Sequence, residues 1–171
     1  FVRAALPHKL IPQITFDMLA EDGRTGNKPI VLLTNGYDSK QDKAILDIIK
    51  QFNSPNHNIA VLCPFIKGVN AFYDLIKATG VTCSKYINDD ADLDAIENVH
   101  ITTFKSCKGT EFDTVIIPDF QSMRYNISYM NVVEENDYYV AFTRARRNLF
   151  LISSIDPTFI HSSTYQKEQL K

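Results

Sequence analysis

The sequence has no tryptophan and only three cysteines among its 171 residues. Cys63, Cys83 and Cys107 lie far apart and form no C-x-x-C pair, so we expect neither a disulfide scaffold nor a zinc module. No apolar run approaches the roughly 20 residues that a membrane span needs, and the start lacks the pattern of a secretory leader. These absences predict a soluble protein without a membrane partner, in the reducing cytoplasm.

The sequence also lacks a large excess of charge of either sign. Its 18 Lys and Arg residues against 20 Asp and Glu residues give a net charge of -2 at pH 7. This balance excludes a chain that holds nucleic acid by bulk charge, so any such contact must come from a local patch. With 44% hydrophobic residues, the chain can bury the core of one ordinary domain.

Short apolar runs alternate with segments of helical periodicity along most of the chain. The helical segments are 39–53, which Ser39 would cap, a second one that would stop at Gly80, and about 134–147. The second segment carries Val69, Phe72, Tyr73 and Ile76 at helical spacing. Strands that alternate with helices pair in parallel through right-handed crossovers, so we predict a three-layer α/β/α fold with a mainly parallel sheet. The candidate strands are residues 30–34, 59–63, 81–87, 99–104, 114–120 and 148–154.

The same periodicity predicts where the domain begins and ends along the chain. Residues 1–28 are poorly periodic and end in a loop rich in turn formers, so we interpret them as a lead-in segment from the preceding part of a longer chain. Residues 29–156 form the predicted α/β domain, and residues 157–171 are expected to be a C-terminal tail.

Two segments carry residues suited to chemistry, and residues 102–120 are the first. Ligands of parallel sheets gather at the carboxyl ends of strands, where this segment delivers Lys105, Lys108, Gly109 and Glu111 in one turn. Glycine lets backbone N–H groups approach an oxygen-rich ligand, and the lysines add positive potential, a combination suited to phosphate. Taken alone, a connecting turn with solvated lysines explains the segment equally well.

The second segment is the predicted helix 134–147. Arg144 lies off its apolar face, and a guanidinium beside a strand end is what stabilisation of phosphoryl-transfer charge requires. Arg146 and Arg147 are explained by the favourable position of cations at a helix C-terminus.

The remaining acidic, cysteine and histidine residues do not indicate a metal site or a reactive nucleophile. The acidic run 88–98 has no calcium-loop glycine, which favours a solvated loop or a short helix over a metal site. Cys107 lies between Lys105 and Lys108, which could lower its thiol pKa, but no histidine base is within sequence reach. The scattered histidines have no partner at ligand spacing, so we predict no metal site.

Residues 102–116, TTFKSCKGTEFDTVI, resemble motif V of UvrD/Rep-type superfamily I helicases, and residues 138–152, YYVAFTRARRNLFLI, resemble motif VI. Residues 59–81 are similar to the strand and helix that precede motif V in that family. The resemblance covers about residues 57–155 and implies a RecA-like fold. It also implies the C-terminal motor domain of an ATP-dependent DNA helicase or translocase.

The resemblance implies a nucleotide role for four residues. Arg144 matches the motif VI arginine that reaches the γ-phosphate of ATP across a cleft. Glu111 matches a glutamate that contacts the nucleotide sugar, while Lys108 and Gly109 match the turn near the phosphates. ATP and Mg²⁺ would be held mainly by an N-terminal RecA-like domain outside this sequence, which is the first implied partner.

Single-stranded DNA is the second implied partner. Thr103 and Lys105 occupy positions that meet the DNA backbone in the family, although the family usually has histidine where this chain has Lys105. Lysine can bind a phosphate as a point charge but does not stack like imidazole. Phe65 could provide a stacking face for a base, or it could be a packing residue.

The sequence contains no G-x-x-x-x-G-K-[ST] segment, so it lacks its own P-loop. We therefore expect the 171 residues to have no ATPase activity alone. The alternative hypothesis is a helicase-like binding platform for RNA polymerase or a nuclease partner, and the family resemblance extends the partner classes to DNA repair proteins. An unrelated flavodoxin-like fold is a third reading, which would leave both motif resemblances as coincidence.

Overall fold

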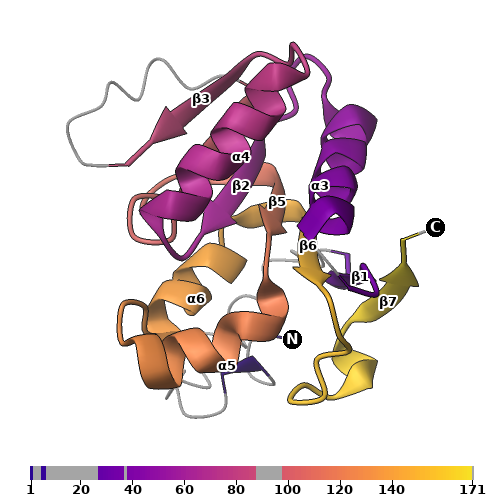
Figure 1. The fold of residues 1–171 in the computed structure, drawn as a ribbon, viewed down its shortest axis with the longest axis vertical. Helices are drawn as coiled ribbons and strands as arrows, with labels where there is room; N and C mark the ends of the chain where they lie inside the picture. Colours follow the sequence, from indigo (N-terminus) through magenta and orange to yellow (C-terminus); the bar gives the residue numbers. More distant parts are fainter. Residues whose placement is uncertain (2–4, 7–26, 37, 88–97, 171) are drawn as a thin grey trace, which may run out of the picture.

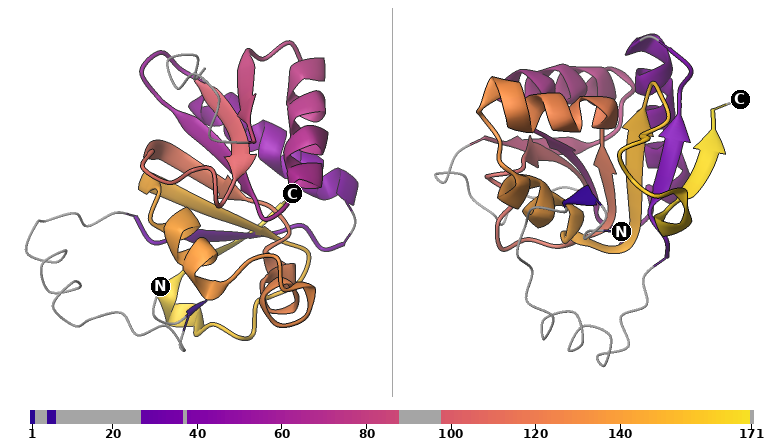
Figure 2. Two further views of the ribbon diagram at one scale, coloured as in Figure 1. Left: turned by 90° about the vertical axis from the view of Figure 1, so that its left-hand side faces the viewer. Right: turned by 90° about the horizontal axis from the view of Figure 1, so that it is seen from below.

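The computed structural model describes residues 1, 5–6, 27–36, 38–87 and 98–170. All strand pairs in the sheet are parallel, and the strand order is β3-β4-β2-β5-β6-β1-β7. Helices lie on both faces of this sheet, as Figure 1 and Figure 2 show. The predicted three-layer α/β/α class is therefore confirmed. The strands are β1 (Ile30–Leu33), β2 (Ile59–Cys63), β3 (Cys83–Tyr86), β4 (Val99–Thr103), β5 (Phe112–Ile117), β6 (Ala145–Ser153) and β7 (Gln166–Gln169).

Helices α3 (Asp38–Phe52) and α4 (Ile66–Ala78) cover one face of the sheet. Their apolar side chains recur at helical spacing and pack against alternate residues of the strands, such as Ile59 and Val61 of β2. Helix α4 stops before Gly80, whose φ of 80° suits the left-handed turn that ends helices. Helix α3 begins at Asp38, so Ser39 lies inside the helix and the predicted cap at Ser39 is wrong.

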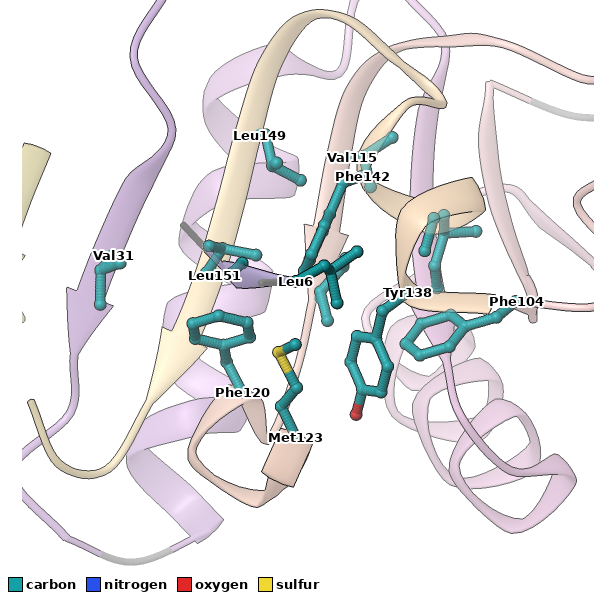
Figure 3. Packing of buried hydrophobic residues seen from close by; sticks show 14 of the residues in the cluster. Leu6, Val31, Phe104, Val115, Phe120, Met123, Tyr138, Phe142, Leu149 and Leu151 are labelled. Carbon is teal, nitrogen blue, oxygen red and sulfur yellow. The ribbon is translucent and has the colours of Figure 1, made fainter. Parts of the chain in front are cut away.

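Helix α6 (Glu135–Phe142) covers the other face together with the segment that leads to it. That segment contains η2 (Phe120–Ser122), α5 (Met123–Tyr125) and the π-helical η3 (Asn126–Met130). Figure 3 shows the core that these elements bury, including Phe104, Phe120, Met123, Tyr138 and Phe142. Tyr138 and Phe104 contact edge to face with ring centroids 4.8 Å apart, so α6 is fixed to the residue that follows β4.

Residues 157–171, expected as a tail, contribute a strand to the sheet. Strand β7 pairs in parallel with β1, and η4 (Ser162–Thr164) precedes it. Ile160 and Tyr165 are buried in the core cluster that also contains α6. Leu6, in the expected lead-in segment, is fully buried in the same cluster. Core packing therefore extends beyond residues 29–156 in both directions.

The structure corrects the helix predicted for residues 134–147. Helix α6 ends at Phe142 with Thr143 as its C-cap, and β6 already begins at Ala145. Arg146 and Arg147 therefore lie on a strand, and the helix dipole does not explain their placement. The physical reason is that backbone pairing of β6 with β5 outweighs the local helical propensity of this segment.

A buried histidine makes the stability of this fold depend on pH. His100 of β4 is 5% exposed, and its Nδ1 lies 2.7 Å from the Ser84 hydroxyl. The Phe112 ring stacks on the imidazole with a centroid distance of 6.0 Å. Desolvation in this site lowers the pKa of His100 from its ordinary 6.5 to about 4. The folded protein therefore keeps His100 neutral in a pH range where the unfolded chain binds a proton.

We expect the free energy of unfolding to fall as the pH drops from about 6.5 to 4, by up to about 3 kcal/mol from this residue. The fall occurs because the unfolded chain binds the extra proton there. The measurement is denaturant unfolding at several pH values for the wild type and His100→Gln. The variant should show a shallower acid slope, and equal slopes in the two proteins would contradict the prediction.

Candidate functional site

Motif V and motif VI meet at the amino edge of the sheet, where the strands begin. Phe112 of β5 is in register with Ala145 of β6, so Glu111 and Arg144, which directly precede them, are neighbours. The Phe112 N–H donates to the Arg144 carbonyl at 2.9 Å. The sequence predicts the motif V residues at the carboxyl end of a strand, and this placement is wrong for Glu111. Parallel strands require the chain to return to the amino edge before β5 begins.

The guanidinium of Arg144 is half-buried and held by acceptors from both motifs. Its Nε donates to the Val140 carbonyl at 3.1 Å, and its Nη2 donates to the Thr143 hydroxyl at 3.2 Å. Its Nη1 donates to the Thr110 carbonyl at 3.2 Å. Arginine has five N–H donors, so one hydrogen on each terminal nitrogen is not used by these contacts. The side chain is thus oriented with donors left for a ligand.

No carboxylate of the part of the chain that the structure describes is paired with Arg144. Among the residues that the structure describes, no ion pair involves Arg144, whereas its neighbours on β6 are both paired. Arg146 Nε lies 2.9 Å from Glu111 Oε2, and Arg147 Nε lies 3.4 Å from Asp113 Oδ1. These two pairs are exposed on the arginine side and contribute little to stability. Arg144 therefore differs from Arg146 and Arg147 in having no carboxylate partner within the described ranges.

The turn between β4 and β5, residues 104–111, is called the motif V turn here. Gly109 in this turn has a φ of 84°, a left-handed conformation that side chains with a Cβ rarely adopt. Lys108 and Gly109 are exposed, and the Thr110 carbonyl beside them accepts the hydrogen bond from Arg144. The structure thus brings Lys108, Gly109, Glu111 and Arg144 into one region.

Cys107 of the motif V turn is not an activated thiol. Its side chain is buried, and its Sγ donates to the Phe104 carbonyl at 3.1 Å. Desolvation raises the pKa of Cys107 to about 11, although Arg144 and Lys108 act in the opposite direction. The lowered pKa considered from the flanking lysines is therefore wrong, because burial outweighs the nearby charges.

Phe65, Thr103 and Lys105 lie at the carboxyl edge of the sheet, at the other end of the strands from Arg144. Cys63, the last residue of β2, is in register with Thr103, the last residue of β4. The Phe104 N–H also donates to the Cys63 carbonyl at 3.0 Å, so Phe65 follows β2 close to the start of the motif V turn. The two groups of candidate residues are therefore separated by the length of the strands.

The side chains of this second group differ in what they offer a ligand. Thr103 is 8% exposed, and its hydroxyl donates to Ser106 Oγ and accepts the Ser106 N–H. Its side chain therefore stabilises the motif V turn. Lys105 is exposed and Phe65 is half-buried, so the ammonium group and part of a ring face solvent at this edge.

A hydrogen-bonded link at the carboxyl edge was not predicted from the sequence. Gln41 of α3 accepts the Asp119 N–H at 2.7 Å and donates to Asp119 Oδ1 at 3.2 Å. Asp119 has a φ of 52°, so this link holds a left-handed residue just after β5. A signal was present, because Gln41 is a polar residue in line with the apolar stripe of α3. The link fixes α3 to the connection between β5 and α5.

A patch of exposed apolar side chains was also missed. Tyr125 and Tyr129 stack with ring centroids 5.5 Å apart, and Tyr129 is 77% exposed. Met130 and Val132 are exposed on the same segment, which the buried Asn126 anchors by donating to the Tyr138 hydroxyl at 3.1 Å. We call these four exposed residues the tyrosine patch. Exposed patches of this composition are typical of interaction surfaces.

The described residues contain no group of three or more His, Cys, Asp or Glu side chains that could hold a metal ion. Residues 88–97 of the acidic run lie outside the described residues. No helix within the described ranges has the length and apolar character required to cross a membrane.

Comparisons with known proteins agree with the motif resemblance. Residues 70–155 match the model of the UvrD-like helicase C-terminal domain. The chain is 29% identical over 171 residues to the putative ATP-dependent DNA helicase R568 of Acanthamoeba polyphaga mimivirus, with 75% of this chain and 24% of that protein covered. It is 36% identical over 69 residues to the RecBCD enzyme subunit RecB of Chlamydia pneumoniae, with 40% of this chain and 6% of that subunit covered.

Solved structures show the same fold at low sequence identity. A structure described as the C-terminal domain of a possible DNA helicase from Lactobacillus plantarum WCFS1 has a TM-score of 0.65 and 20% identity. The match covers 85% of this chain and 88% of that one. The arterivirus nonstructural protein 10 helicase has a TM-score of 0.50 and 9% identity, and the match covers 87% of this chain and 36% of that one.

The parallel sheet with helices on both faces and the two adjoining motifs define a RecA-like domain of the helicase class. Because the matching model spans half of the sequence, the chain belongs to the UvrD-like helicase C-terminal domain family. It spans about a quarter of the mimivirus relative and a much smaller part of RecB.

Proposed function

We propose that this chain is the C-terminal motor domain of an ATP-dependent superfamily I DNA helicase or translocase. The observation that carries the proposal is the state of Arg144, whose guanidinium is oriented by both motifs and has no carboxylate partner among the described residues. A fixed guanidinium with free donors is suited to phosphate oxygens and to the charge that develops in phosphoryl transfer. Arg144 would act as an arginine finger on ATP held by another domain.

The remaining nucleotide contacts would come from the same edge. Glu111, held by Arg146 at 2.9 Å, would accept hydrogen bonds from the sugar hydroxyls. Lys108 and Gly109 would lie near the phosphates, where an exposed ammonium and a close backbone approach are both favourable. Because the chain has no P-loop, an N-terminal RecA-like domain would supply the main contacts to ATP and Mg²⁺.

Single-stranded DNA would bind at the opposite, carboxyl edge. The exposed ammonium of Lys105 would contact a backbone phosphate, and the Phe65 ring would offer a face to a base. Thr103 would act by stabilising the turn that presents Lys105. Support for DNA as a partner also comes from the arterivirus helicase, which has the same fold and was solved with DNA. Separate edges would let nucleotide and DNA bind simultaneously.

A second candidate function is a helicase-like binding platform for RNA polymerase, a nuclease or another DNA repair protein. The tyrosine patch favours it, since exposed tyrosine and methionine are enriched at protein interfaces. The two functions predict different sequences upstream of this chain. An intact P-loop and magnesium-binding carboxylate there would favour the motor, whereas their loss would favour the platform.

The test of the motor function compares the full-length protein with the 171-residue chain. We expect the full-length protein to release phosphate from ATP in the presence of Mg²⁺. Single-stranded DNA should stimulate the rate of this reaction. The chain alone should release none, since it lacks the P-loop lysine and backbone cradle. If the 171 residues alone released phosphate, and Arg144→Ala abolished this activity, the proposal that another domain supplies the main contacts to ATP would be contradicted. A full-length protein without ATPase activity would favour the platform.

A further inference from the structure

Thr143 lies between the end of α6 and Arg144. Hydrogen bonds fix the direction in which its hydroxyl group donates its proton. The Oγ1 atom is 3.0 Å from both the Tyr139 and the Val140 carbonyl oxygens. A hydroxyl group has one proton, and here both carbonyls draw that proton toward the helix. The oxygen lone pairs therefore face the other way, where the Arg144 Nη2 donates to them at 3.2 Å.

The three acceptors of Arg144 are not equivalent. The Val140 and Thr110 acceptors are backbone carbonyls, so Thr143 provides the only side chain among them. The Val140 carbonyl also belongs to the last turn of α6, where the helix dipole favours a cation. Thr143 is thus the one contact that a substitution can remove without moving the backbone.

The contact with Thr143 also decides which donors stay available. It occupies one hydrogen of Nη2, while Thr110 occupies one hydrogen of Nη1. The two remaining hydrogens belong to different terminal nitrogens, which is one requirement for an end-on contact of a guanidinium with two oxygens of one phosphate. Without Thr143, the guanidinium could rotate about its remaining contacts and lose this direction.

We propose that Thr143 is a positioning residue for Arg144. Its hydroxyl orients the guanidinium toward a phosphoryl group bound at the amino edge of the sheet and does not itself touch the nucleotide. This inference rests on the proposed function, because it assumes that Arg144 serves phosphoryl transfer.

The experiment uses the full-length protein and the variants Thr143→Val, Thr143→Ser and Arg144→Ala. Valine keeps the shape of threonine without the hydroxyl, whereas serine keeps the hydroxyl. We expect kcat for ATP hydrolysis to fall about tenfold in Thr143→Val, the effect of losing one hydrogen bond to a charged group. Thr143→Ser should stay within about twofold of the wild type, since the acceptor is retained.

Thr79→Val is the matched control. Thr79 is the C-cap of α4, as Thr143 is of α6, and its hydroxyl donates to the Ile76 carbonyl at 2.7 Å. It accepts no hydrogen bond from a guanidinium among the described contacts. We expect Thr79→Val to change stability as Thr143→Val does and to leave kcat unchanged.

A second readout separates positioning from general damage. ADP with aluminium fluoride mimics the transferring phosphoryl group, so its affinity should fall with kcat in Thr143→Val, while the affinity for ADP stays unchanged. Equal losses for both ligands, or an equal kcat loss in Thr79→Val, would refute the positioning role. Wild-type kcat in Thr143→Val with an inactive Arg144→Ala would also refute it and leave the motor function standing. Full turnover in Arg144→Ala would instead refute the arginine-finger role on which this inference rests, and a full-length wild-type protein without ATPase activity would refute the motor function.

Discussion

Arg144→Ala in the full-length protein is expected to lower ATP turnover by about 10³-fold or more, the effect that arginine fingers have on phosphoryl transfer. The physical reason is the loss of a fixed positive charge and two free donors at the amino edge of the sheet. Binding of single-stranded DNA should stay measurable, because Phe65 and Lys105 lie at the opposite edge. The measurements are steady-state phosphate release and a DNA-binding titration on the same preparation.

Two further variants sharpen this prediction. Arg144→Lys should remain strongly impaired, because an ammonium group cannot make the forked contacts of a guanidinium. Arg147→Ala is the matched control: Arg147 is close in sequence, its side chain is 68% exposed, and its partner is Asp113. That variant should keep near wild-type turnover. A fully active Arg144→Ala protein would exclude the arginine-finger role.

Phe104→Ala is expected to destabilise the fold by about 3–5 kcal/mol, the usual effect of removing a buried phenylalanine ring. Phe104 is fully buried, and its ring contacts Tyr138 edge to face (Figure 3). The substitution would leave a cavity between the motif V turn and α6, the two elements that hold Arg144. Denaturant unfolding followed by circular dichroism measures the change.

Tyr129→Ala is the control for that substitution, since it removes an aromatic ring that is largely exposed. It should change the free energy of unfolding by less than about 0.5 kcal/mol. A loss below about 1 kcal/mol in Phe104→Ala would show that the packing between Phe104 and Tyr138 does not stabilise the domain.

Buried elements could be predicted well from the sequence. Strand β2 occupies residues 59–63 as predicted, and α4 stops at the glycine that the sequence singled out. Both follow from apolar periodicity and from the conformational freedom of glycine, which are local properties. Strand β7 was missed because its side chains are all exposed and polar, so no hydrophobic pattern marks it. Only hydrogen bonding to β1 makes it a strand.

The roles of the candidate site residues stay a prediction, but the position of Glu111 in the sheet differs from the one that the sequence indicated. Residues 134–147 carry a helical pattern, but pairing with β5 makes a strand from Ala145 onward. The same pairing places Arg144 beside Glu111 at the amino edge. A contact between residues of two different elements cannot be inferred from their positions in the sequence. The contact of Arg144 with Thr110 was missed for this reason.

The sequence by itself determined the α/β class, the elements in the buried layers and the two motifs that carry the helicase resemblance. These depend on residue type and spacing, which fix which surfaces must be buried. Only the tertiary structure decided which edge of the sheet each motif reaches and which groups hold the guanidinium of Arg144. Register between parallel strands and hydrogen bonds between distant residues determine these features, and both arise only when the chain is folded.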